Sequence, residues 1–311
     1  MKSLVVYFSQ TSSTQKIAYA IHRGISHKVE KCDIMPLKGV TPGDLDKYDL
    51  IGLGSPVWQD SPPNLKRFIK SLPRYEGKHI FCFCTHGTGG VMFFPTVGKL
   101  LTERGFTVIG FRDWYGSNHI PCFPSPYMTD GHPDEIDLKE AAEFGEEMVD
   151  LSQRITAGET QLIPPIPDIP VNHAPPPSTP LQPGRSAHGQ KIFDREKCNY
   201  PNCHICIDNC PLDCIDMSAS QPVPEVCEGG CVFCDLICPT GAIHSEDLEY
   251  GLEHLHANVW IFEQDLAKAE ATGHFRRLIP KDKVGWDTPY YKVHSKHPRF
   301  KIPKEPGTDT V

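Results

Sequence analysis

Short apolar runs alternate with segments of helical periodicity over the first half of the chain. The apolar runs predict five strands, at Lys2–Phe8, Val29–Ile34, Asp49–Gly54, His79–Cys84 and Phe106–Arg112. Several of these runs are apolar almost throughout, as expected of parallel strands that are covered on both faces. Helical patterns lie between and after them, at Thr14–His27, Pro63–Leu72, Pro95–Arg104 and from Pro133 onward. This alternation predicts a compact three-layer α/β domain over residues 1–154.

The second half of the chain has a different composition. A length of 311 residues favours two domains, and nine of the 13 cysteines lie between Cys198 and Cys238. Nine of the 30 prolines lie between Pro164 and Pro183, in a stretch without periodicity. We expect a proline-rich linker over residues 155–190, which either straps the second domain to the first or leaves it mobile. Beyond it we expect a small cysteine-rich domain over residues 191–250. Residues 251–311 are expected to form a C-terminal part with a helix at Glu263–Thr272 and a basic, aromatic tail.

The net charge of −8 is unevenly distributed. Residues 155–275 carry 17 acidic against five basic side chains, whereas residues 276–311 carry nine basic against four acidic ones. The acidic middle argues against nucleic acid as the main partner, because phosphate binding needs Lys and Arg. The basic tail is a solvated end, a docking surface for an acidic partner, or a segment that packs back onto the acidic cysteine-rich domain.

The hydrophobic segments are too short for a membrane protein or a secreted one. No uncharged run reaches the roughly 20 residues that span a bilayer, so we expect no membrane span. The apolar start, Met1–Phe8, is too short for a signal peptide. The expected location is therefore cytoplasmic, where abundant cysteines are typical of metal ligands rather than of disulfides.

Parallel α/β sheets bind ligands beyond the carboxyl ends of their strands, which directs attention to the loops there. The loop after the first strand has five hydroxyl side chains in six residues: Ser9, Gln10, Thr11, Ser12, Ser13 and Thr14. It leads into a helix, whose free N–H groups and neighbouring hydroxyls suit a phosphate. It lacks both the lysine of a Walker motif and the G-x-G-x-x-G of a dinucleotide site. The loop is therefore either a monophosphate cradle or a serine-rich turn that caps the helix.

The loops after the third and fourth strands carry features that suit a flat heteroaromatic ring. The third-strand loop contains Ser55, Pro56, Val57 and Trp58. Its tryptophan either stacks on a ring or packs under the neighbouring loop. The fourth-strand loop contains Thr85, His86, Gly87, Thr88, Gly89 and Gly90, and its glycines let backbone approach a ligand closely.

With these three loops the chain resembles a flavodoxin. The resemblance implies a five-stranded parallel sheet of order 2-1-3-4-5 and an FMN site formed by the three loops, with Ser12 where the family commonly has glycine. Typical members carry a second aromatic residue in the last loop, and this chain has only Gly, Thr and His there. One face of the flavin is thus expected to be open to a partner, a substrate or the rest of the chain. His86 either donates a hydrogen bond to the flavin or is satisfied by local backbone.

Two related cysteine runs lie in the second domain. Cys203, Cys206 and Cys210-Pro211 recur 28 residues later as Cys231, Cys234 and Cys238-Pro239. Each run ends in C-x2-C-x3-C-P, which is typical of bacterial ferredoxins, and zinc is the competing interpretation of paired C-x2-C groups. The stretch resembles a bacterial-type two-cluster ferredoxin of small α+β fold.

That resemblance implies two [4Fe-4S] clusters with crossed ligands, because the cysteine before each proline binds the cluster of the other repeat. One cluster is assigned to Cys198, Cys203, Cys206 and Cys238. The other is assigned to Cys210, Cys227, Cys231 and Cys234. Cys214 takes the position of Ala242 in the second repeat, and we expect it to be a small packing residue.

As a whole the chain resembles proteins of anaerobes that join a flavodoxin domain to a two-cluster ferredoxin. The resemblance implies an electron-transfer protein that couples one-electron donors to a two-electron acceptor through FMN and two [4Fe-4S] clusters. Its expected partners are a low-potential donor and an acceptor enzyme, met either by a monomer or by a homo-oligomer. The alternatives are an iron–sulfur flavoprotein reductase that acts on a small molecule at the flavin, and a fixed subunit of a larger redox complex. No set of acids, bases or nucleophiles indicates substrate chemistry, so no catalytic residues are assigned.

Overall fold

The chain divides into two compact units. The computed structural model describes residues 1–58, 60–89, 92–168, 180, 182 and 185–303. The first unit comprises Met1–Ser9, Ser13–Ser117 and Gly131–Ala174. The second comprises Gln10–Ser12, Asn118–Asp130 and Pro175–Val311. Each unit is described by itself.

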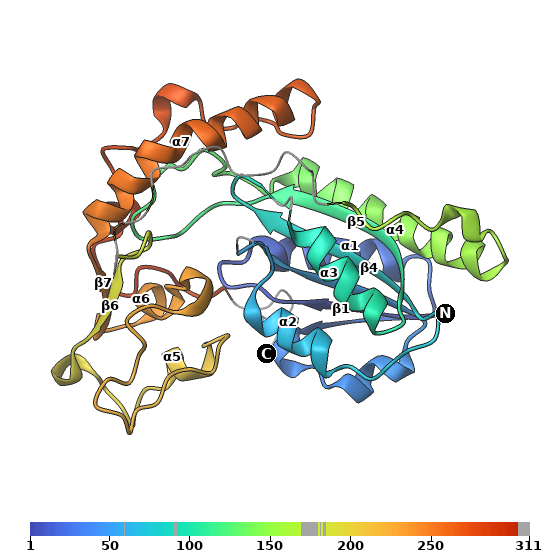
Figure 1. Cartoon of the computed structure of the whole chain (residues 1–311), viewed down its shortest axis with the longest axis horizontal. Coiled ribbons are helices and arrows are strands. Elements are labelled where there is room, and N and C mark those ends of the chain that lie inside the picture. Colours follow the sequence, from blue (N-terminus) through green and yellow to red (C-terminus); the bar gives the residue numbers. More distant parts are fainter. Residues whose placement is uncertain (59, 90–91, 169–179, 181, 183–184, 304–311) are drawn as a thin grey trace. The chain divides into compact units, whose positions relative to one another are not determined.

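The first unit is built on a parallel sheet with the strand order β2-β1-β3-β4-β5 (Figure 1). The strands are β1 Lys2–Tyr7, β2 Lys31–Pro36, β3 Leu50–Pro56, β4 His79–His86 and β5 Thr107–Tyr115. All four strand pairings are parallel, and a register shift interrupts the last of them between Ile80 and Phe81. The predicted order 2-1-3-4-5 is confirmed, and the observed strand ends differ from the predicted ones by at most three residues.

Helices cover both faces of this sheet because successive residues of a buried strand point to opposite sides. The helices are α1 Ser13–Ser26, α2 Pro63–Ser71, α3 Phe93–Glu103 and α4 Glu135–Thr156. Leu4 and Val6 of β1 pack in the apolar cluster that contains side chains of α2 and α3. Val5 and Tyr7 pack in the opposite cluster, with side chains of α1 and α4. Short 3₁₀ turns complete the unit at η1 Leu37–Gly39, η2 Pro42–Lys47 and η3 Thr160–Leu162.

Helices α1 and α4 approach each other closely through glycine. A Cβ at Gly24 would overlap the backbone carbonyl oxygen of Ala142, and one at Gly145 would lie 2.5 Å from the carbonyl oxygen of Ile21. Both contacts are with backbone, which cannot move aside as a flexible side chain can. The two glycines therefore fix how near the helices lie, and with it the core beneath them.

The second unit contains an antiparallel strand pair and several helices, most of them short. Its strands are β6 Gln190–Phe193 and β7 Ile243–Glu246, and its helices are α5 Ile205–Asp208, α6 Phe233–Ile237, α7 Leu248–Ala271 and α8 Tyr290–Val293. Its 3₁₀ turns are η4 Arg195–Lys197, η5 Glu228–Gly230 and η6 Lys281–Lys283. Helix α7 was expected to begin at Glu263, and it begins at Leu248. Among the described helices, none is long and apolar enough to cross a membrane.

The 28-residue repeat is visible in the backbone of the second unit. Helix α5 contains Cys206, and α6 contains the equivalent Cys234. Asp213 has a φ of 51°, and Gly241, 28 residues later, has a φ of 69°. The left-handed conformation at both positions means that each cysteine run is followed by the same kind of turn.

Asn118–Asp130, the middle of the chain between β5 and α4, belongs to the second unit. The backbone N–H of Ser125 donates to the carbonyl oxygen of Thr288 at 3.0 Å, and that of Tyr290 donates to Phe123 at 2.8 Å. Farther on, the N–H of Phe300 donates to the carbonyl oxygen of Leu236 at 2.8 Å. The aromatic end of the chain is therefore packed, up to Phe300, into the unit that holds the cysteine runs.

Replacing Gly24 with alanine is expected to lower the free energy of unfolding by about 1–3 kcal/mol, because the new methyl group meets backbone of α4. The matched control is Gly43→Ala, where an added Cβ has nothing within 4 Å. Thermal unfolding of the full chain followed by circular dichroism measures both. Equal stability of the two variants would contradict the close approach of α1 and α4.

Candidate functional site

Two of the three predicted loops meet through buried threonines. The hydroxyl oxygens of Thr14, in the first turn of α1, and Thr85, in β4, lie 2.7 Å apart. The carbonyl oxygen of Thr85 also accepts a hydrogen bond from the N–H of Val57 in the third-strand loop, at 2.9 Å. Thr85 thus links the ends of α1, β3 and β4 in one network.

Gly116, just after β5, lies beside the candidate site, and the sequence did not indicate it. A Cβ there would lie 2.8 Å from Cβ of Ser13 and 3.8 Å from Cβ of Thr85. Its N–H donates to the carbonyl oxygen of His86 at 3.0 Å. A larger residue would fill the space beside the N-terminus of α1, so glycine keeps this end of the sheet open.

The middle of the first loop has an unusual backbone. Gln10, Thr11 and Ser12 are grouped with the second unit, so only Ser9, Ser13 and Thr14 are placed with the strand ends of the first. Ser12 has a φ of 72°, and its hydroxyl donates to the carbonyl oxygen of Thr11 at 2.6 Å. A left-handed backbone at this position favours glycine, which gives a physical reason for the glycine of the resembled family.

The third-strand loop holds Trp58 half-buried. Its ring packs edge-on against Phe8, with ring centroids 5.9 Å apart and an interplanar angle of 73°. Ser55 is fully buried, and its hydroxyl donates to the carbonyl oxygen of Pro56 at 2.9 Å. Trp58 therefore makes the packing contact that was one of its two expected roles, and part of its surface remains exposed.

His86 is held by a carboxylate rather than by local backbone. Its Nε2 lies 2.7 Å from Oδ2 of Asp113 on β5, and its ring packs edge-on against Tyr115. Its Nδ1 is buried without a hydrogen-bond partner among the described residues. The sequence alone did not indicate Asp113, because the pairing depends on the register of β4 and β5. In the same loop Gly87 and Thr88 are half-buried and Gly89 is exposed, whereas Gly90 lies outside the described residues.

The cysteines of the second unit form two overlapping groups. Cys198, Cys206 and Cys238 pack around the small apolar cluster of Val223, Ala242 and Ile243, as does Cys234. Burial raises the pKa of Cys206 to about 11, and the nearby thiols of Cys238 and Cys203 act in the same direction. Cys238 of the second run is thus a neighbour of the first run.

The second group lines one cavity. Its sulfur-bearing residues are Cys206, Cys210, Cys214, Cys227, Cys231 and Cys234, and apolar side chains complete the wall. Burial raises the pKa of Cys234 well above its usual value, and the neighbouring thiol of Cys231 adds to the effect. Thiols crowded in this way resist ionisation unless a cation or a cluster takes the place of their protons.

The thiol of Cys214 lies close to two other thiols of this group, which its expected role as a small packing residue does not require. Its Sγ lies 3.6 Å from Sγ of Cys210 and 3.9 Å from Sγ of Cys227. Six thiols therefore line the cavity: the four assigned to one cluster, Cys206 of the other cluster's set, and Cys214 of neither.

The remaining cysteines belong to the core. Cys82 and Cys84 are buried in β4, where burial raises the pKa of both thiols. Burial raises the pKa of Cys122 to about 12, and its Sγ lies 3.3 Å from the carbonyl oxygen of Ala187 within the second unit. Burial also raises the pKa of the half-buried Cys32 to about 11. Protonated thiols of this kind are poor ligands and poor nucleophiles.

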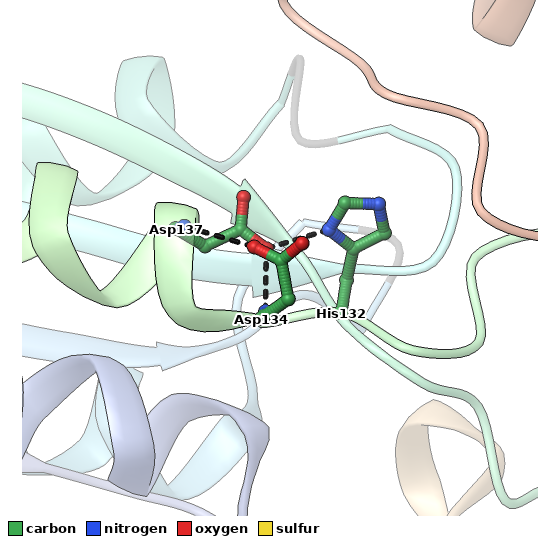
Figure 2. Close-up of side chains that lie close together, drawn as sticks. All are labelled: His132, Asp134 and Asp137. Atoms are coloured by element: carbon green, nitrogen blue, oxygen red, sulfur yellow. Dashed lines mark hydrogen bonds and ion pairs between the residues drawn. The ribbon is translucent and has the colours of Figure 1, made fainter.

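A group of His132, Asp134 and Asp137 also brings possible metal ligands together, and Figure 2 shows its side chains at the start of α4. Oδ1 of Asp134 accepts hydrogen bonds from the N–H groups of Ile136 and Asp137. Oδ2 of Asp137 accepts one from the N–H of Asp134 at 2.8 Å and lies 2.6 Å from Nδ1 of His132. This is a capping box, which satisfies the free N–H groups of a helix end without any metal.

Comparison with known proteins identifies the first unit by class. Residues 4–92 match the family model of the flavodoxin domain. The chain is 28% identical over 154 residues to an uncharacterised protein of Methanocaldococcus jannaschii, a match that covers 48% of this chain and 99% of the relative. It is 27% identical over 174 residues to the flavodoxin-like domain-containing protein BilS of Clostridioides difficile, covering 48% of this chain and 97% of that protein. A solved archaeal flavodoxin matches with 22% identity and a TM-score of 0.39, covering 49% of this chain and 99% of that one. The chain therefore contains a flavodoxin-like domain.

Proposed function

We propose that the protein transfers electrons between FMN, held by the flavodoxin-like domain, and two [4Fe-4S] clusters, held by the cysteine runs of the second unit. The observation that carries the proposal is the grouping of the thiols. Cys238 is a neighbour of Cys206, and Cys210 lines the same cavity as Cys227, Cys231 and Cys234. This crossing of the two runs is the ligand pattern of two-cluster ferredoxins.

The geometry of the thiols favours a cluster over zinc. Four cysteines around one zinc ion have Zn–S distances of about 2.3 Å, so their sulfurs lie about 3.8 Å from one another. Within the described part of the chain, no three cysteine sulfurs all lie within 4.8 Å of one another. The cavity they line is apolar apart from the thiols and Asn209. Cys214 lies at zinc-like distances from Cys210 (3.6 Å) and Cys227 (3.9 Å), but no three described cysteine sulfurs lie mutually this close. The apolar cavity therefore suits a larger group than a single ion.

The strand ends of the flavodoxin-like domain suit FMN. The N-terminus of α1 offers N–H groups and the Ser13 hydroxyl, which are hydrogen-bond donors for a phosphate. Gly116 keeps space beside them. His86 has a buried Nδ1 without a described partner, and the pairing with Asp113 holds its ring in place. These groups would bind and orient the cofactor.

The bound groups would supply the electron chemistry, since a cluster exchanges one electron at a time and FMN one or two. The protein's contribution is to bind them, exclude water and set their potentials. No described arrangement of side chains indicates a small-molecule substrate, so the carrier role is preferred to that of a reductase.

Protein purified without oxygen is expected to contain about eight iron atoms, about eight sulfides and one FMN per chain, because two cubane clusters require this stoichiometry. Metal and sulfide analysis with flavin extraction measures it. Zinc without acid-labile sulfide would contradict the cluster assignment. Rapid turnover of a small molecule without a second protein would favour the reductase.

Replacing Trp58 with alanine is expected to weaken FMN binding by roughly tenfold, which corresponds to the loss of one aromatic contact. Fluorescence titration of flavin-free protein measures the affinity. Trp260→Ala is the matched control, because Trp260 is partly exposed on α7 in the other unit. If both variants bind FMN as the parent does, the ring lies elsewhere.

Replacing Cys210 with serine is expected to remove one cluster, about four of eight iron atoms, whereas Cys214→Ser keeps both. The pair is matched because the two sulfurs lie 3.6 Å apart in the same cavity. Iron analysis and electron paramagnetic resonance distinguish the variants. The reverse result would make Cys214 the fourth ligand and Cys210 its neighbour.

A further inference from the structure

Lys191 is buried beside the second cysteine run. It lies in β6, opposite Ser245 of β7, and only 1% of its surface is exposed. It is the one lysine among the buried residues of the described chain. A buried ammonium group is costly unless an opposite charge compensates it.

The protein supplies Lys191 with a carbonyl oxygen and no carboxylate. Its Nζ donates to the carbonyl oxygen of Cys231 at 3.0 Å. None of the ion pairs formed by the described residues includes it. The fully buried carboxylate of this region, Asp235, is already matched by Arg299, with Nη1 and Oδ1 3.1 Å apart.

The groups around Lys191 do not neutralise it. The neighbouring His188, whose Nδ1 lies 2.7 Å from the carbonyl oxygen of Gly230, has a side chain that is neutral or positive and supplies no negative charge. Nζ of Lys191 contacts the backbone of Cys231, whose thiol lines one cavity with that of Cys234. Among its described neighbours, these thiols are the groups that can become negatively charged without already being paired. The missing negative charge is therefore on the sulfur side of Lys191.

We propose that Lys191 is the counter-charge of the cluster assigned to Cys210, Cys227, Cys231 and Cys234, and that it makes this cluster the more easily reduced of the two. The inference rests on the proposed function. A [4Fe-4S] core with four thiolates carries a charge of −2 when oxidised and −3 after it accepts one electron, with no bond formed or broken. A fixed positive charge in a region of low dielectric stabilises the more negative state.

The other cluster has a lysine of a different kind. Lys197 precedes Cys198, but 57% of its side chain is exposed and its Nζ pairs with Asp194 at 2.8 Å. Water and the partner carboxylate screen this charge. The two sets of four cysteines thus lie in different electrostatic environments. The cluster next to Lys191 is expected to be reduced first.

The test is a redox titration of the full-length protein, purified without oxygen and followed by electron paramagnetic resonance. Lys191→Gln keeps a donor for the Cys231 carbonyl and removes the charge. It is expected to lower the midpoint potential of one cluster by at least 59 mV, a tenfold change in the equilibrium constant of a one-electron couple, and to leave the other unchanged. Lys191→Arg, which keeps the charge, and Lys197→Gln, the exposed control, are expected to shift neither by that amount. Cys234→Ser identifies the signal that belongs to the cluster near Lys191.

Each other outcome has a defined meaning. If Lys191→Gln loses the cluster and Lys191→Arg retains it, the charge is required and the inference stands. An unshifted potential in Lys191→Gln, a shift of the other cluster, or loss of the cluster from both variants would overturn it. A parent protein without iron and sulfide would instead overturn the proposed function, and that analysis precedes the titration.

Discussion

On the proposed function, the part of the second unit around the two cysteine runs depends on the groups that the cysteines bind. The apolar cluster between the two runs has few members, and one of them is Cys238 itself, with Val223, Ala242 and Ile243. Two ionisable residues, Lys191 and Asp235, are buried in the same region. Small domains of this kind commonly obtain their stability from a metal group, whose binding free energy becomes folding free energy. The thiols would then be structural as well as functional, and the region around the two runs is expected to be stable only when they are ligated.

The flavodoxin-like domain, by contrast, does not need a ligand to complete its core. Its sheet has an apolar cluster on each face. The candidate site lies outside these two clusters, at the carboxyl ends of the strands. Thr14, Thr85 and Gly116 lie close together there. A domain built in this way is expected to remain folded when its cofactor leaves, whereas the proposed cluster sites are expected to lose their order without their clusters.

The sequence predicted the parts of the structure that depend on local pattern. The five strands are short buried runs, and the cysteine spacing repeats, so both were recognisable. Helix α7 was not found in full, because Gly251 and Asn258 break its pattern before Glu263. Asp113 and Gly116 became site neighbours only through strand register and chain path, for which the sequence carries no local signal. The placement of Asn118–Asp130 in the second unit was missed for the same reason.

Lys191 is another residue whose role depends on strand pairing that the sequence does not reveal. A lysine between Gln190 and Ile192 in an acidic segment reads as a solvated residue, and only the pairing of β6 with β7 shows it to be buried. The two cysteine runs share the C-x2-C-x3-C-P spacing and the turn that follows it. In the proposed two-cluster carrier, this shared part cannot make one cluster differ from the other. Any preferred direction of electron flow between them must come from residues that break the repeat. Lys191 is a strong candidate for that role because an uncompensated buried charge acts over a longer range than a hydrogen bond and is weakly screened.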